Sequence, residues 1–372
     1  MSAPAPVSPV PTGSPATSES PETGAAPAVP VRPARPVHPV RPARRRVLFL
    51  VVALALVAAT LLLSLWVGVR TVDLETLWRV LWHPDGSEEA FIVTELRAPR
   101  AALALLLGAA LGVAGALIQA LTRNPLADTG ILGVGAGSSF AVVLGIAFFG
   151  VTSLSQYLWL SFAGAVVVTV LVYALGSVGS LGATPVRLTL VGVALGALLG
   201  GFSSAITMLN PKAFDDLLRW SAGSLAGRGW ETFGAVWIPI AVGLALALVA
   251  GRPLNAIALG DDAARALGAG VIRTRVLVIV AVTLLAGAAA AAAGPIGFVG
   301  LMVPHVVRWF TGPDQRWIIP FSALGAALLL LVADVVGRVV LAPKELEVGI
   351  VTAFLGAPVL IALARRRNVS AL

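Results

Sequence analysis

Apolar segments long enough to cross a lipid bilayer recur along this chain, and they restrict its fold more than any other feature. A helix needs about 17–25 apolar residues to cross ~30 Å of hydrocarbon, where the backbone must satisfy its own hydrogen bonds. Windows of that kind lie at residues 47–69, 101–121, 130–150, 157–176, 188–209, 233–251, 276–293, 295–310, 317–341 and 348–364. Only 12% of the residues are charged, against about 25% in soluble domains. The sequence therefore predicts an all-α polytopic membrane protein of about ten transmembrane helices.

The basic residues indicate how these spans are oriented. If the N-terminus lies in the cytoplasm, most of the 26 lysines and arginines fall on the cytoplasmic side, as the positive-inside rule requires. This predicts that both termini are cytoplasmic and that the number of spans is even, with eight as the alternative to ten. The window at 295–310 is the least regular, because it is short and contains Pro304. We expect a partly broken helix there.

Residues 1–43 form a separate segment that is rich in proline, alanine and serine and has no apolar periodicity. Such a composition cannot bury a core, so we expect a disordered cytoplasmic tail with polyproline character. The transmembrane domain then comprises residues 44–372. Its first apolar run, from Val47, exceeds the 7–15 residues usual in a signal peptide and predicts an uncleaved anchor.

Several kinds of chemistry are excluded by what the sequence lacks. It has no cysteine, and His38, His83 and His305 lie far apart, so we expect no metal site and no cofactor. Lys212 and Lys344 are the only lysines, and neither lies in a G-x-x-x-x-G-K-[ST] motif. The spans contain no paired carboxylates and no nucleophile–base set, so an enzyme is not expected. The net charge of +8 does not predict nucleic-acid binding, since no basic patch is interleaved with aromatic residues.

Asp334 is an acidic residue inside a predicted span, and Arg338 follows it by one helical turn on the same face. We expect the two to neutralise each other near the outer end of the helix. Proton- and ion-driven carriers use intramembrane carboxylates as relays. An ion-coupled secondary transporter acting through Asp334 is therefore the alternative from a different functional class.

Two arginines mark the outer end of the second predicted span. Arg97 and Arg100 flank Pro99, after which a helix can start, so we expect both guanidiniums at the water interface. Guanidinium groups suit bidentate binding of carboxylates. Docking of an acidic partner and simple anchoring at the interface are both open on this pattern.

The inner loop at 252–275 contains a second candidate site. Asp261 and Asp262 complement the dipole at the start of a short helix, and Gly268 is placed to end it. Leu259 and Leu267 gather with small residues on one side, while Arg265 stays exposed. Such a helix suits docking into a groove of a partner, or it lies on the membrane surface.

Glycines spaced four residues apart and one proline-containing turn predict further local structure. Glycines four residues apart predict close helix packing or, alternatively, a smooth pore wall; the sets are Gly108/Gly112, Gly133/Gly137 and Gly192/Gly196/Gly200. The inner turn at 123–128 is a fixed corner, because Pro125 keeps Asn124 out of helical geometry.

These motifs, in this order, resemble those of the FecCD family, the permease subunits of bacterial ABC importers for iron-siderophore complexes and vitamin B12. The resemblance covers residues 47–367 and includes LRAPR at 96–100, LGDDAARALG at 259–268, GPIGFVGLMVPHVVRWF at 294–310 and PKELEVGIVTAFLGAPVLIALA at 343–364. The chain departs from the family at Glu347, where a proline is common, and in its long proline-rich tail.

The resemblance implies roles for particular residues. Arg97, Arg100 and Arg338 would receive acidic residues of an extracytoplasmic substrate-binding protein. Asn124 and Leu126 would help to close the cytoplasmic gate. The segment that couples the permease to a cytoplasmic ABC ATPase would comprise Leu259, Gly260, Asp261, Asp262, Ala263, Arg265, Leu267 and Gly268.

The resemblance also implies an assembly and a cargo. Two permease subunits, identical or homologous, would form a dimer in the lipid of the bacterial cell membrane, with ATP hydrolysed on the partner subunits. The expected cargo is a ferric siderophore, moved into the cytoplasm by alternating access. Cobalamin or haem is the alternative cargo for the same machinery.

Overall fold

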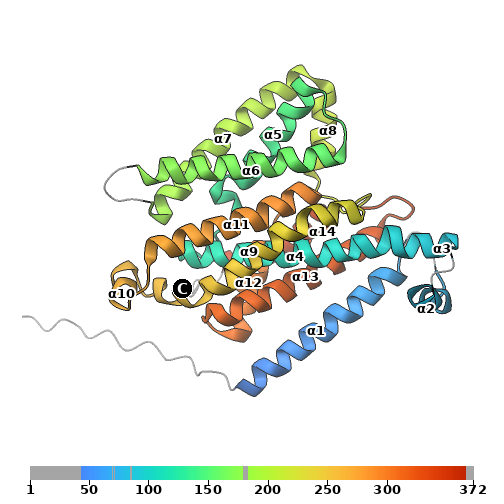
Figure 1. Cartoon of the computed structure of the whole chain (residues 1–372), viewed down its shortest axis with the longest axis horizontal. Helices are drawn as coiled ribbons and strands as arrows, with labels where there is room; N and C mark the ends of the chain where they lie inside the picture. Colours follow the sequence, from blue (N-terminus) through green and yellow to red (C-terminus); the bar gives the residue numbers. More distant parts are fainter. Residues whose placement is uncertain (1–42, 69, 71, 84–85, 179–182, 366–372) are drawn as a thin grey trace, which may run out of the picture. The chain divides into compact units, whose positions relative to one another are not determined.

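The computed structural model describes residues 43–365 except 69, 71, 84–85 and 179–182. Residues 1–42 of the predicted tail lie outside this range, and Ala43 begins the first helix. Figure 1 shows an arrangement of helices. Their bounds are α1 Ala43–Trp66, α2 Leu74–Trp82, α3 Glu88–Phe91, the π-helix η1 Ile92–Arg97, α4 Ala98–Thr122, the 3-10 helix η2 Thr129–Leu132, α5 Val134–Phe149, α6 Leu154–Ser177, α7 Pro185–Leu209, α8 Pro211–Ser221, α9 Trp230–Ile257, α10 Asp261–Ala266, α11 Val271–Ala293, α12 Val299–Thr311, α13 Gln315–Val340 and α14 Val348–Arg365.

Every predicted apolar window coincides with a helix. Within the described ranges, 7 helical segments are long and apolar enough to cross a membrane. The windows at 130–150, 295–310 and 348–364 correspond to the shorter helices α5, α12 and α14. The multi-pass helical fold is therefore confirmed, whereas the exact number of crossings and their direction stay predictions. The amphipathic helices α2 and α8, which lie between spans, were not predicted.

The second span begins earlier than the sequence indicates. We expected its helix to start after Pro99, but helical structure runs from Glu88 through η1 into α4. Within η1 the hydrogen bonds span five residues, and the Ala98 N–H donates to the Val93 carbonyl. Pro99 has no N–H for the Thr94 carbonyl, which instead accepts a hydrogen bond from the Trp230 indole Nε1 at 3.0 Å. The local widening of the helix and this tryptophan accommodate the proline.

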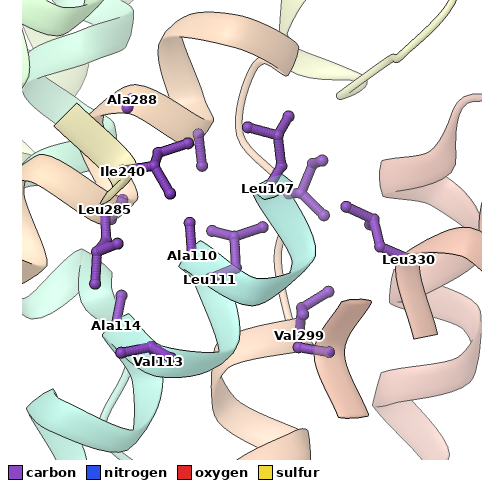
Figure 2. Close-up of a cluster of buried hydrophobic side chains, with 14 of the residues drawn as sticks. Leu107, Ala110, Leu111, Val113, Ala114, Ile240, Leu285, Ala288, Val299 and Leu330 are labelled. Atoms are coloured by element: carbon purple, nitrogen blue, oxygen red, sulfur yellow. The ribbon is translucent and has the colours of Figure 1, made fainter. Parts of the chain in front are cut away.

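Helix α4 lies at the centre of the buried core. In the helical segment that ends with it, 78% of the apolar window is buried, the same fraction as in α11, whereas the values for α1 and α7 are 6% and 11%. Figure 2 shows side chains of α4 surrounded by those of four other helices, α9, α11, α12 and α13. The labelled residues are Leu107, Ala110, Leu111, Val113 and Ala114 of α4, with Ile240, Leu285, Ala288, Val299 and Leu330.

Glycines of α4 allow two neighbours to approach at backbone distance. A Cβ on Gly108 would lie 2.6 Å from the carbonyl oxygen of Ala326 in α13. A Cβ on Gly115 would lie 1.8 Å from the carbonyl oxygen of Gly300 in α12. Because lipid cannot replace the dispersion attraction between backbones that lie this close, the approach stabilises the fold. The prediction of tight packing at Gly108 and Gly112 is confirmed.

The short helix α12 depends on a glutamine of α4. Pro304 cannot donate to the carbonyl of Gly300, four residues earlier. The fully buried Gln119 fills this place, with its Nε2 donating to Gly300 at 3.3 Å and to Leu301 at 3.0 Å. Its Oε1 accepts a hydrogen bond from Arg308 at 2.6 Å. The expected irregular span is thus a helix of 13 residues whose broken backbone bonding is completed by its neighbour.

Helices α5 to α8 pack with one another and contact the core mainly through α11, with a smaller contact between α7 and α4. Gly192 of α7 packs on the backbone of Ile131, where a Cβ would lie 1.8 Å from the carbonyl oxygen. Gly196 is looser, and nothing in the described part of the chain lies within 4 Å of a Cβ on Gly200. One face of α7 is therefore uncovered, and it carries large apolar side chains: Val186, Leu190, Val193, Leu198, Phe202, Met208 and Leu209.

The contact at Gly115 yields a stability prediction. We expect Gly115→Ala to lower the apparent melting temperature in detergent, because its methyl group meets backbone rather than a movable side chain; overpacking costs about 1–3 kcal/mol even where side chains yield. Gly234→Ala on α9 is the matched control, since no atom of the described residues would lie within 4 Å of a Cβ at that position. Equal melting temperatures for the two variants would contradict the close packing of α4 on α12.

Candidate functional site

Arg97 binds the carboxyl-terminal end of α1. Its Nη1 donates to the carbonyls of Leu65 at 2.9 Å and Trp66 at 2.6 Å, and its Nη2 donates to the carbonyl of Arg70. The carbonyls of Leu65 and Trp66 have no helical partners because α1 ends there. Gly68 lets the guanidinium pass, since a Cβ on it would lie 2.6 Å from Nη2. Arg97 therefore fixes the end of a helix that has little other burial.

An alternating chain of charges lies beside it. Asp334 binds Arg338 through Oδ2 and Arg100 through Oδ1, the latter with Nε at 2.8 Å. Arg100 in turn donates from Nη1 to Glu345 at 2.6 Å. Arg338 also donates to the carbonyl of Ser64 in α1 at 2.8 Å. The predicted pairing of Asp334 with Arg338 is confirmed, and the aspartate holds a second cation that the sequence did not indicate.

The structure brings the three predicted docking arginines together, but it does not leave them equally accessible. Arg97 is 6% exposed and Arg338 is 3% exposed. Our expectation that the Arg97 guanidinium stays in interfacial water is therefore wrong, because the end of α1 covers it. Arg100 is half-buried and shared between two carboxylates.

A cavity of about 510 Å³ opens beside these arginines. Its lining residues are Gly68, Arg70, Ile92, Glu95, Leu96, Arg97, Arg100, Ala226, Gly227, Arg228, Gly229, Arg338 and Glu345. The loop residue Arg228 differs from the other cations. Burial lowers its pKa to about 10, and among the described residues no carboxylate forms an ion pair with it. Its buried Nε also has no hydrogen-bond partner there. Arg228 remains charged at neutral pH and faces a cavity that can take an anion.

The other candidate segment lies between α9 and α11. Helix α10 begins at Asp261, and Gly268 adopts a left-handed conformation just after its end, as the sequence predicted. Leu259 and Leu267 are 68% and 67% exposed, whereas Ala264 packs on the ends of α9 and α11. The segment therefore presents two leucines outward.

Next to α10 lies the corner that follows α4. Arg123 ends α4 with a φ of 52°, and Asn124 accepts the backbone N–H of Leu126 on its Oδ1 at 3.0 Å. Arg123 also donates to Oδ1 of Asp261 at 2.5 Å, while Arg275 donates to Oδ2 at 2.5 Å. The corner and the α10 segment are thus joined by a carboxylate, a contact that the sequence did not indicate.

The remaining sequence candidates serve the fold. The ring of His305 lies edge-on to that of Trp309, with centroids 5.7 Å apart. Arg308 binds Gln119 as described above. Across the described ranges, no three His, Asp or Glu side chains gather so that they could hold a metal ion.

A multi-pass helical bundle with a cationic cavity at one end and an exposed short helix at the other defines a membrane transport protein. The chain belongs to the FecCD transport family, whose model matches residues 55–366. It is 48% identical over 315 residues to the ferric enterobactin transport system permease protein FepD of Escherichia coli, covering 85% of this chain and 94% of that protein. It is 35% identical to the hemin transport system permease protein HmuU of Yersinia pestis, over 86% and 93% of the two chains.

A solved structure described as a metal-chelate type ABC transporter in an inward-facing conformation has the same fold. It matches with a TM-score of 0.75 and 27% identity, covering 86% of this chain and 99% of that chain. The protein is therefore a permease subunit, as its motifs indicated.

The charge chain yields a second prediction. We expect Asp334→Asn to lower the apparent melting temperature strongly, because removing one partner of a buried ion pair costs about 3–5 kcal/mol. Glu345→Gln should cost less, since the Glu345 side chain is 29% exposed. A thermal melt in detergent compares them. If Glu345→Gln were the more damaging change, Asp334 would not be the centre of the cluster.

Proposed function

We propose that this chain is the membrane-spanning permease subunit of an ATP-driven ABC importer that carries ferric siderophores into the cytoplasm by alternating access. One observation supports the assignment of the cargo. The relative that is 48% identical, with 94% of its length covered, is a permease protein of a ferric enterobactin transport system. Haem is the alternative supported by the 35% identical hemin permease, and cobalamin remains the other candidate cargo.

The energy source would be a separate cytoplasmic ATPase. Neither lysine of the chain lies in a phosphate-binding motif. The segment Leu259–Gly268 suits a groove of that ATPase, since its two exposed leucines stand beside exposed charges of Asp262 and Arg265. The segment also comprises Gly260, Ala263 and Asp261, whose carboxylate binds Arg123 and Arg275 of this chain. This assignment places α10 and both termini in the cytoplasm.

A second permease subunit would cover the exposed face of α7. Apolar residues such as Leu190 and Phe202 would meet lipid or a partner there, and the open Gly200 allows a close helix approach or a smooth wall for a bulky cargo. The transport pathway would run between the two subunits. Leu126, which is 38% exposed, and Asn124 would form part of its cytoplasmic gate.

An extracytoplasmic binding protein would dock over the arginine-lined cavity. Arg97, Arg100 and Arg338 would set the positive field there, although each already binds groups of this chain. Arg228 is the cation best placed to pair with an acidic side chain of the binding protein, because burial has removed much of its water and the described residues give it no counter-charge.

An ion-coupled carrier is the rival from another class. In that mechanism Asp334 must gain and lose a proton, yet it lies between Arg100 and Arg338 and is 1% exposed. Both of its carboxylate oxygens already accept hydrogen bonds from these two arginines. This geometry supports a structural role for Asp334 over a relay.

Uptake measurements test the proposal directly. We expect cells that lack this gene to lose uptake of radiolabelled iron presented as ferric enterobactin, with labelled haem and cobalamin assayed alongside. The intact gene should restore uptake, and vanadate should block it. Loss of haem or cobalamin uptake alone would assign that compound as the cargo instead. Uptake that survives vanadate but stops with a protonophore would favour an ion-coupled carrier.

Complementation with charge variants tests the docking surface. We expect Arg228→Glu to lower uptake about tenfold or more, since like charges facing each other across an interface cost several kcal/mol. Lys212→Glu makes the same change of charge on α8, outside the cavity, and should retain uptake. Equal uptake by the two variants would place the docking site elsewhere. Arg228→Glu is sharper than reversal of Arg97 or Arg338, whose loss would also free the end of α1.

A further inference from the structure

The carboxylate of Asp261 connects three segments that are far apart in the sequence. It begins α10, and it receives one arginine from the end of α4 and another from the first turns of α11. Each oxygen accepts one of these hydrogen bonds, both at 2.5 Å. The two bonds to one carboxylate hold α10 in two directions at once, because hydrogen bonds between charged groups are roughly twice as strong as those between neutral groups.

The two ion pairs of Asp261, with Arg123 and with Arg275, form a link that is partly shielded from water. The Asp261 side chain is 28% exposed, Arg275 is 10% exposed and Arg123 is 36% exposed. Burial alone would raise the pKa of Asp261, but Arg275 and Arg123 outweigh it and hold the pKa below its usual value. The carboxylate is therefore charged across the physiological pH range.

The neighbouring aspartate shows a different arrangement. Asp262 pairs with Arg265 within α10, and its side chain is fully exposed. That pair can stabilise the short helix, but it holds α10 to nothing else. Of these two adjacent acidic residues, Asp261 is the one turned toward the helix bundle.

The corner end of the link is itself rigid. Arg123 has a left-handed backbone conformation, which is uncommon for a residue with a side chain. Its N–H and that of Asn124 bond back to the carbonyls of Ala120 and Gln119. Gln119 is the residue that completes the bonding of α12. A displacement at Asp261 therefore meets a stiff corner attached to the most buried helices.

We infer that Asp261 is a positioning residue that transmits movement of α10 through Arg123 to the corner at 123–128. The inference rests on the proposed function, in which the ATPase moves α10 and Leu126 belongs to the gate. Without the Arg123 bond, an ATPase docked onto α10 would move only this short helix and the ends of α9 and α11 on which it packs. The Arg123 bond adds the end of α4, so that ATP-driven displacement reaches the gate.

The test uses the importer purified through a tag on this chain, together with its ATPase, in proteoliposomes that contain the binding protein and ferric enterobactin. We expect Asp261→Asn and Arg123→Gln each to lower cargo moved per ATP at least about fivefold, the lower end of typical coupling effects. The ATPase should still co-purify. The double variant should be no worse than Asp261→Asn alone, since that change already removes the bond to Arg123.

The matched control is Arg273→Gln. Arg273 lies two residues before the linked Arg275, is exposed, and forms no ion pair with the described residues. It should retain wild-type coupling. If Asp261→Asn also retained it, or if the effects of the two single changes added in the double variant, the inference would be overturned.

A second readout does not depend on the cargo. The chain contains no cysteine, so a spin label attached to Leu126→Cys before the partner proteins are added reports the corner alone. We expect trapping with ATP and vanadate to change its spectrum in the wild-type background and to leave it unchanged with Asp261→Asn. The same change in both backgrounds overturns the inference. Failure of the ATPase to co-purify with the wild-type chain would instead refute the proposed function, on which the inference depends.

Discussion

The approach of α4 to its neighbours at backbone distance is the constraint on which the rest of this structure depends. At Gly108 and Gly115 there is room for a hydrogen atom and not for a methyl group. A helix packed so closely on two sides becomes the fixed element against which the others are placed. The arginine cluster then attaches to it through Arg97 and Arg100, and the corner through Arg123.

Exclusion of water explains why so many polar side chains of this chain bind backbone. Gln119 donates a hydrogen bond to a carbonyl that Pro304 cannot reach for lack of an N–H. Arg97 and Arg338 donate to carbonyls that have no helical partner because α1 ends there. Each unsatisfied group would cost several kcal/mol in hydrocarbon. A side chain with the chemistry of a binding group can therefore be needed by the fold, and both demands can fall on one arginine.

The helical fold could be predicted from the sequence because length and hydropathy leave a membrane chain few choices. The Asp334–Arg338 pair and the short helix from Asp261 were also predictable, since both depend on spacing within one segment. Contacts between distant segments were not. Nothing in the sequence pairs Arg123 with Asp261 or separates Arg228 from the other arginines of the cavity, because burial and missing counter-charges arise only in three dimensions. The start of the second span was misplaced for a related reason, as Trp230 compensates for Pro99 from another helix.

The π-helix η1 sets the rotational phase between the two parts of a long helix. Ile92, Glu95 and Leu96 line the cavity together with Arg97. An unbroken α-helix would keep the first three on one face but would turn Arg97, five residues after Ile92, about 140° away from it. Each residue of an α-helix turns about 100°, so shortening η1 by one residue would swing everything before it, including α3, to another side of α4. The surface offered to a partner is therefore encoded by a local winding defect as much as by the residues that line it. Homologues with the same arginines but a regular α-helix at this position would share the charges, but the opening of their cavity would have a different shape.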